Sequence, residues 1–125
     1  MALLTLDAIK DELLSGDLTS MHVLVRPSKW SGRGQVPAVL FISKHAVFYG
    51  GSEATKNRYH RISFKSISCV KIVGKLFMKS LEVEYLSVAG VKRIYFCPFT
   101  GDPHQPSIDV KMLHELQKIL QKSVK

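Results

Sequence analysis

The chain has 125 residues, 46% of them hydrophobic, which suffices for one domain whose core needs neither a metal ion nor disulfides. No apolar run approaches the ~20 residues of a membrane-spanning helix, and the first ten residues lack the pattern of a signal peptide. Lys and Arg number 18 against 10 Asp and Glu, a net charge of +8. We therefore expect a single cytoplasmic domain over residues 1–125 without a transmembrane segment.

The positive charge is concentrated in the middle of the chain. Residues 26–79 hold 11 Lys and Arg against a single Glu, whereas residues 1–25 sum to −3 and residues 80–125 to +1. A segment of one sign produces a field that attracts phosphate-bearing or acidic partners, and a basic surface also serves solubility alone. Composition leaves both interpretations open.

Residues 1–18 are predicted to form a helical extension. Leu6, Ile9 and Leu13 recur at helical spacing, Thr5 is a suitable cap, and Gly16 can end the helix. From Met21 onward the apolar period becomes that of strands, which are predicted at 21–26, 36–42, 46–49, 58–62, 69–73, 80–86 and 91–97. Residues 64–67 are predicted to be a tight bend or a single helical turn.

The last two predicted strands allow a prediction of register. If Leu86 faces Val91, then Glu84 faces Arg93, an opposite-charge pair of the kind that stabilises neighbouring strands. The same register pairs Val83 with Ile94 and Leu81 with Phe96. We therefore expect an antiparallel hairpin with one buried face.

A loop over residues 98–106 and an amphipathic helix over residues 107–122 complete the chain. Ser107 is the predicted cap, Asp109 lies in the first turn, and Lys122 near the end complements the helix dipole. The apolar stripe of this helix consists of Met112, Leu113, Leu116, Ile119 and Leu120.

Neither catalytic nor metal-binding chemistry is expected. Cys69 and Cys97 are interpreted as buried free thiols in a reducing compartment. An oxidised pair is the less favoured alternative, because the two cysteines are predicted on strands that are not neighbours. None of the five histidines has a metal-ligand spacing with them. No Ser or Cys comes with a recognisable His partner motif, so we predict a non-enzyme without cofactors.

Seven antiparallel strands followed by one helix resemble the pleckstrin-homology (PH) superfold. Two stretches are similar to GRAM-type PH-like domains: residues 39–49, VLFISKHAVFY, and residues 61–70, RISFKSISCV. The resemblance implies a mainly β (α+β) fold, a bent, partly open barrel whose end is closed by the C-terminal helix. It also implies a binding module for phosphoinositides or other anionic membrane lipids, or for peptides and partner proteins.

In lipid-binding PH domains the loop after the first strand carries a basic cluster. The matching residues are Arg26, Lys29, Trp30 and Arg33, whose cations suit an anionic leaflet and whose indole suits a membrane interface. The alternative is that Trp30 anchors the loop while the cations are solvated.

A second basic cluster lies around the fourth predicted strand. Lys56, Arg58 and Arg61 either extend the first patch or form a charged edge strand that discourages edge-to-edge pairing. A third cluster, Lys71, Lys75 and Lys79, surrounds an apolar triplet that could touch a bilayer or belong to the core.

Three functions follow, in order of preference. The first is peripheral docking of the basic loop face on an anionic phospholipid surface. The second is protein–protein interaction, since residues 36–42 lack the basic residue of the inositide motif and the stripe of Leu6, Ile9 and Leu13 suits a partner. The third is nucleic-acid binding, for which only Trp30, Tyr59 and Tyr95 offer stacking platforms.

Overall fold

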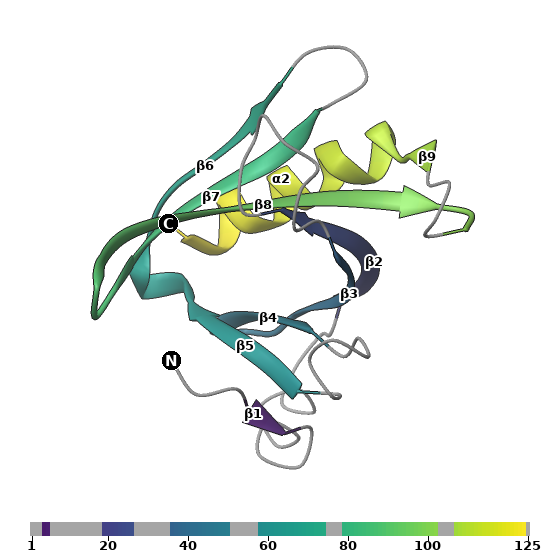
Figure 1. The fold of residues 1–125 in the computed structure, drawn as a ribbon. Coiled ribbons are helices and arrows are strands. Elements are labelled where there is room, and N and C mark those ends of the chain that lie inside the picture. Colours follow the sequence, from purple (N-terminus) through teal and green to yellow (C-terminus); the bar gives the residue numbers. More distant parts are fainter. Residues whose placement is uncertain are drawn as a thin grey trace.

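The computed structural model describes residues 4–5, 19–26, 36–50, 58–74, 79–102 and 107–124. Within these ranges one antiparallel sheet curls into a half-barrel, and a C-terminal helix packs across it (Figure 1). The elements are β1 (Leu4–Thr5), β2 (Thr19–Arg26), β3 (Val36–Ile42), β4 (Ala46–Gly50), β5 (Arg58–Ser63), the 3-10 helix η2 (Phe64–Ser66), β6 (Ile67–Val73), β7 (Ser80–Ser87), β8 (Gly90–Thr100), β9 (Ser107–Ile108) and α2 (Val110–Val124).

The sheet consists of two series of hairpins joined by one strand. Its order is β1-β5-β4-β3-β2-β8-β7-β6, with β9 added to β8. β2 pairs with β3 through residues 19–25 and with β8 through residues 23–26, so it connects the N-terminal hairpins to the C-terminal ones. The short 3-10 turn η2 carries the chain from β5 to β6.

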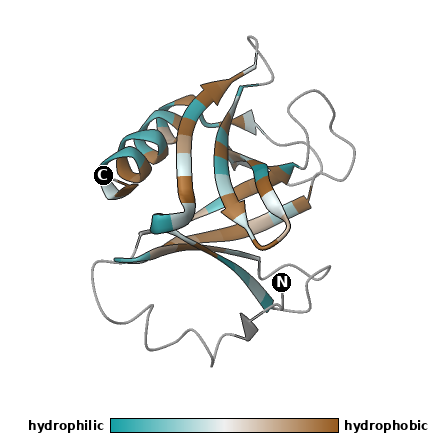
Figure 2. Cartoon of the chain, turned by 90° about the vertical axis from the view of Figure 1, so that its left-hand side faces the viewer, coloured by the Kyte–Doolittle hydropathy of each residue, from teal (hydrophilic) through white to brown (hydrophobic). Residues whose placement is uncertain are grey.

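The core lies between the inner face of the sheet and α2. Period-2 alternation sends Val23, Leu40, Val83 and Phe96 inward, where all are essentially inaccessible to solvent. Leu113, Leu116 and Leu120 of α2 recur at helical spacing and are fully buried against β6, β7, β8 and η2. Each such side chain contributes about 1.5–3 kcal/mol of burial. Figure 2 shows apolar stretches along the strands and a helix of mixed hydropathy.

Most predicted elements are confirmed within a few residues. The seven predicted strands correspond to β2 through β8, and the tight bend at residues 64–67 is η2. The predicted hairpin register is also confirmed, since Leu81, Val83, Glu84 and Leu86 of β7 pair with Phe96, Ile94, Arg93 and Val91 of β8.

The segment before α2 differs from the prediction. β8 continues to Thr100, and β9 pairs with its end, so Pro98 and Phe99 belong to a strand and not to a loop. Ser107 lies in β9 and does not cap the helix. Asp109 does, because its Oδ1 accepts a hydrogen bond from the Met112 backbone N–H at 3.0 Å. The Asp109 N–H donates to the Pro98 carbonyl at 2.9 Å, which fixes the start of α2 on the sheet.

The predictions for the two cysteines and for the N-terminal helix are met only in part. Cys97 is a buried free thiol as predicted, but Cys69 is exposed because it lies on an outward-facing position of β6. Leu4 and Thr5, at the start of the predicted helical extension, form β1 and pair with Tyr59 and Arg58 of β5. Residues 6–18, which hold the rest of that helix, lie outside the described residues.

No helix within the described ranges combines the length and the apolar character needed to cross a bilayer.

Candidate functional site

A two-residue turn between β3 and β4 presents Lys44 and His45. Ser43 closes it: its backbone N–H donates to the Ala46 carbonyl at 3.0 Å, and its hydroxyl donates to the same carbonyl at 3.1 Å. The Ser43 hydroxyl also accepts from the N–H groups of His45 and Ala46, at 3.3 and 3.2 Å. One buried side chain thus satisfies the turn, while Lys44 and His45 remain exposed.

The turn η2 presents Lys65 beside them. The Ser63 hydroxyl accepts from the Lys65 N–H at 3.3 Å and caps the turn, and the Ser66 hydroxyl donates to the Ser63 carbonyl at 2.7 Å. The Phe64 N–H donates to the His45 carbonyl at 2.9 Å, so the two turns are joined directly. Backbone hydrogen bonding therefore holds Lys44, His45 and Lys65 at one place, although they come from separate connections.

These turns surround a hollow of about 440 Å³, here called the cationic hollow. Its lining is Lys44, His45, Arg61, Ser63, Phe64, Lys65 and Ser123. Arg61 is half-buried, and its guanidinium carbon lies 5.9 Å from the centre of the Phe48 ring, within reach of a cation–π contact. One half-buried arginine and two exposed lysines thus converge on a volume typical of small-ligand sites.

A second hollow of about 240 Å³ shares Arg61 with the first. It lies between β4–β5 and the β7–β8 hairpin, and its lining is Tyr49, His60, Arg61, Ile62, Tyr85 and Lys92. The rings of Tyr49 and His60 stack with centroids 4.7 Å apart. Burial raises the pKa of the Tyr49 hydroxyl, with a further contribution from Tyr85, and burial lowers the pKa of His60. Both rings are therefore neutral at pH 7, and the charge of this hollow comes from Arg61 and Lys92.

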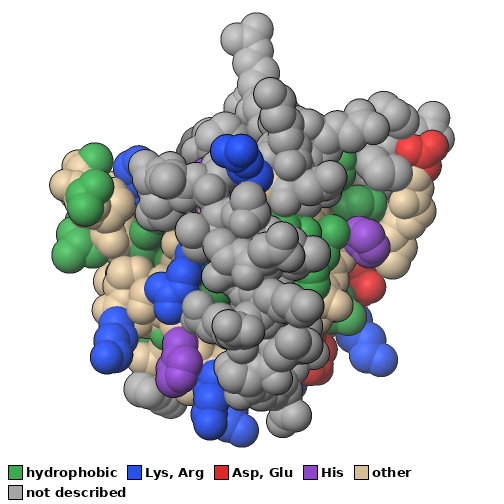
Figure 3. Space-filling view, turned by 90° about the horizontal axis from the view of Figure 1, so that it is seen from below, with side chains coloured by type: hydrophobic (Ala, Val, Ile, Leu, Met, Phe, Trp, Pro, Cys, Tyr) green, Lys and Arg blue, Asp and Glu red, His purple; other side chains and the backbone are tan. Residues whose placement is uncertain are grey.

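No described Asp or Glu lines either hollow. The ion pairs found among the described residues are Lys71–Glu82 and Arg93–Glu84, and neither involves Lys44, Lys65 or Lys92. In the space-filling view, Lys and Arg side chains and a His gather at the lower left, on the side that holds the β7–β8 turn, while the visible Asp and Glu side chains lie on the right (Figure 3). The hollows are thus surrounded by positive charge.

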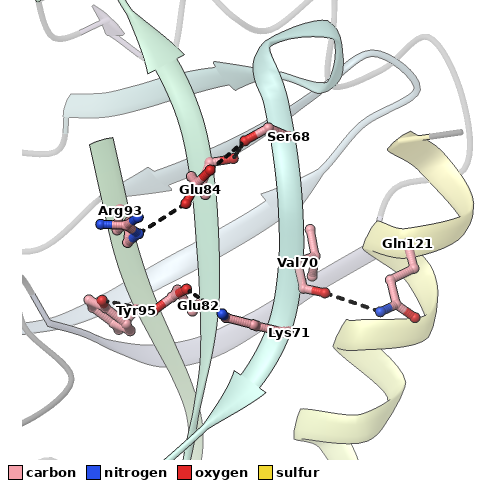
Figure 4. A network of polar contacts seen from close by, with 8 residues as sticks. All are labelled: Ser68, Val70, Lys71, Glu82, Glu84, Arg93, Tyr95 and Gln121. Atoms are coloured by element: carbon pink, nitrogen blue, oxygen red, sulfur yellow. Dashed lines mark hydrogen bonds and ion pairs between the residues drawn. The ribbon is translucent and has the colours of Figure 1, made fainter. Parts of the chain in front are cut away.

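The outer face of β6–β8 has the opposite arrangement, because its carboxylates are all partnered (Figure 4). Glu82, almost fully buried, accepts from the Tyr95 hydroxyl at 3.0 Å and lies 3.6 Å from Lys71 Nζ. Glu84 accepts from Arg93 Nε at 3.0 Å and from the Ser68 hydroxyl at 3.0 Å. This confirms the predicted Glu84–Arg93 pair.

Gln121 of α2 completes this region at the edge strand β6. Its side-chain amide donates to the Val70 carbonyl at 3.1 Å. A helix side chain thus occupies a backbone acceptor of the last strand in the sheet path, which lowers the tendency of that edge to pair with another chain.

Three of the residues predicted for anion binding, Arg26, Arg58 and Arg61, are described, and of these three only Arg61 lines the hollows. Arg26 ends β2 opposite Tyr95 and is 6% exposed, a buried position that differs from the exposed one expected of it. Arg58 is exposed at the start of β5, where it pairs with Thr5. Because β3 and β4 lie between β2 and β5, the structure does not bring these two arginines together. Lys29, Trp30, Arg33 and Lys56 lie outside the described residues.

The β5 edge hypothesis is modified by β1. β5 lies between β1 and β4, so its first two residues are covered by a neighbouring strand.

The third predicted cluster is described only in part. Lys71 is paired with Glu82, whereas Lys75 and the apolar triplet that follows it lie outside the described residues. Lys44, Lys65 and Lys92 were not predicted as site residues, although Lys44 and Lys65 lie in turns between predicted strands and Lys92 in a predicted strand. The available signal was that both serine-bounded turns carry a lysine.

Comparison with known proteins places the fold. No family model matches the chain, and no curated protein matches it. Among solved structures, the C-terminal domain of an unknown protein from Leishmania infantum aligns with a TM-score of 0.64 and 15% identity, covering 95% of this chain and 93% of that one. The hSac2 domain from the human phosphoinositide phosphatase Sac2 aligns with a TM-score of 0.58 and 18% identity, covering 96% and 80%.

These likenesses show the fold alone. The shared fold is PH-like: a curled antiparallel sheet with one C-terminal helix.

Proposed function

We propose that the chain is a non-catalytic PH-like binding module, of GRAM type, that docks on the headgroups of anionic membrane lipids. The observation that carries the proposal is the cationic hollow, where Lys44, Arg61 and Lys65 converge from separate segments without a described carboxylate in the lining. Lys92 extends the positive charge into the second hollow.

The physical basis is electrostatic attraction with several simultaneous contacts. Each Lys or Arg near an anionic leaflet contributes about 1 kcal/mol, so four cations suffice for reversible peripheral binding. Arg61 is oriented by its contact with Phe48, and a guanidinium suits the bidentate recognition of phosphate oxygens. The Ser63 hydroxyl in the same lining adds a further polar group.

Two other observations support the proposal. A domain of similar fold occurs in a phosphoinositide phosphatase, which makes a phosphate-bearing lipid a reasonable ligand class. The basic loop residues Lys29, Arg33 and Lys56, with Trp30, supply a second set of contacts in the proposal, beside the exposed Arg58.

Co-sedimentation with vesicles tests the proposal. Binding is expected to rise with the fraction of phosphatidylserine or phosphoinositide, and to fall between about 0.1 M and about 1 M salt, where the Debye length shortens from about 10 Å to about 3 Å. Equal recovery on neutral phosphatidylcholine and anionic vesicles would contradict it. Salt-independent recovery on anionic vesicles alone would also contradict the electrostatic mechanism.

A further inference from the structure

The turn of the β7–β8 hairpin exposes an unusual concentration of apolar side chains. Leu86 is 63% exposed, Val88 105% and Val91 62%. These are three of the five large hydrophobic residues that stand exposed among the described residues, and they lie within six consecutive positions. Single exposed apolar residues are ordinary, whereas a cluster at a protruding turn indicates a contact surface. Residues 86–91 are called the hairpin tip below.

The Ser87 side chain satisfies two backbone polar groups of the hairpin tip. Ser87 and Gly90 face each other across a two-residue turn. The Ser87 hydroxyl donates to the Gly90 carbonyl at 3.0 Å and accepts from the Ala89 N–H at 3.2 Å. Gly90 has φ +112°, which favours glycine and allows the tight closure. Leaving water therefore costs this turn less than it would cost an open loop.

The charges beside the hairpin tip indicate what it contacts. Residues 86–91 carry no charge, and the flanking charges are Lys92 on β8 and the ion pair of Arg93 with Glu84. Lys92 lies in the second hollow, which shares Arg61 with the cationic hollow. An apolar projection next to Lys92 and Arg61 is complementary to a bilayer with an anionic surface, where acyl chains lie directly beneath the phosphates.

We propose that the hairpin tip inserts into the membrane while the neighbouring cations contact the headgroups. This inference rests on the proposed function and adds the orientation of docking. Val88 inserts deepest in this orientation. Leu86 and Val91, which are cross-strand partners on one face of the hairpin, insert less deeply. At the ~3.4 Å rise per residue of a strand, Val88 extends about 10 Å beyond Lys92, comparable with the ~5–10 Å depth of interfacial segments.

The test compares serine substitutions at the hairpin tip with a serine substitution at an exposed apolar residue elsewhere. The double variant Leu86→Ser, Val88→Ser is expected to lose at least about tenfold in affinity for phosphatidylserine vesicles, because two side chains lose their apolar burial. The control is Val110→Ser, which also replaces an exposed apolar side chain by serine but lies at the start of α2. It should leave the affinity unchanged. Both variants should unfold at the wild-type urea concentration, since the altered side chains are exposed.

A probe on the tip reports insertion directly. Val88→Cys in a Cys69→Ser background carries an environment-sensitive fluorophore; Cys97, the other thiol, is fully buried. Its emission should shift to the blue on anionic vesicles, and the same probe at Val110→Cys should not shift. If wild type sediments with anionic vesicles but the probe does not shift and the serine variant binds normally, the insertion is wrong and the proposed function stands. The same combination of results is expected if the hairpin tip binds a protein partner and not the membrane. If wild type does not bind these vesicles at all, both proposals fail.

Discussion

Two charged regions of this small domain are organised in opposite ways. On the outer face of β6–β8, Glu82 and Glu84 are each held by a hydrogen-bond donor and a cation. Around the cationic hollow, Lys44, Arg61 and Lys65 converge with no described carboxylate in the lining. A paired network contributes to the fold and leaves little field outside, whereas a cluster of one sign repels itself and attracts an anion. The comparison separates a structural charge arrangement from one suited to a ligand.

The two regions also differ in the elements that carry them. The pairs on β6–β8 lie on strands, where period-2 alternation and cross-strand register place opposite charges side by side. The cationic hollow is presented mostly by turns, whose serines satisfy the backbone and leave the lysine side chains in solvent. Changes in the first region should therefore alter stability, and changes in the second should alter binding.

The largest expected effect is on binding by the cationic hollow. The double variant Lys44→Glu, Lys65→Glu should weaken affinity for anionic vesicles by at least about thirtyfold, since removal of two cations alone costs about 2 kcal/mol. Its urea unfolding midpoint should stay near wild type because both side chains are exposed. Lys111→Glu, Lys118→Glu on the exposed surface of α2 makes the same change in net charge. If this control weakens binding equally, net charge and not the hollow determines affinity.

The next effect is on stability, through Glu82. Tyr95→Phe removes the hydroxyl that donates to this carboxylate, which is 4% exposed and retains Lys71 at 3.6 Å. We expect a loss of about 1–3 kcal/mol in the free energy of unfolding, measured by urea titration, and no change in vesicle binding. Tyr85→Phe is the matched control, because no hydrogen bond of its hydroxyl is found within the described ranges. A neutral Tyr95→Phe would show that Glu82 is adequately held without the phenol.

A smaller stability effect is expected at the exposed pair. Arg93→Ala removes the partner of Glu84, and the Arg93 side chain is 56% exposed. The loss should be at most about 1 kcal/mol and should shrink as salt is added, because exposed ion pairs are screened. A double-mutant cycle with Glu84→Gln isolates the pair energy. A coupling energy well above about 1 kcal/mol would show that the Arg93–Glu84 pair stabilises the fold as the Glu82–Tyr95 hydrogen bond is expected to do.

The smallest effect is the pH dependence due to His60. Burial lowers its pKa in the folded protein, so the folded state binds fewer protons than the unfolded state, in which the pKa is about 6.5. The stability that depends on neutral His60 is therefore complete above that value and is lost as the pH falls below it. His60→Gln should flatten the decrease in unfolding free energy between about pH 7 and pH 5. His114→Gln on α2 is the control, and an unchanged slope in His60→Gln would contradict the assignment.

Sequence patterns predicted the sheet well because strand alternation and turn residues are local signals. The hairpin of β7 and β8 was predicted down to its register, since only one register both pairs Glu84 with Arg93 and places Val83 opposite Ile94. The start of α2 was less predictable. Ser107 and Asp109 are both good caps, and the choice of Asp109 depends on β9 pairing with β8, a contact that no local pattern contains.

The candidate site was predicted only in part, for the same reason. Arg61 was identified, but Lys44 and Lys65 lie in two separate turns and Lys92 lies on β8, and their proximity depends on the curl of the sheet. Arg26 illustrates the converse case. It was predicted to contact an anionic leaflet, whereas pairing of β2 with β8 buries it opposite Tyr95.

The sequence itself determined the positions of the strands along the chain, the apolar stripe of the helix and the excess of positive charge. Each of these depends only on which residue types occur and how they are spaced along the chain. The tertiary structure decided which cations meet, which carboxylates are neutralised and which apolar turn protrudes. These depend on strand order and sheet curvature, which bring together residues that are distant in sequence.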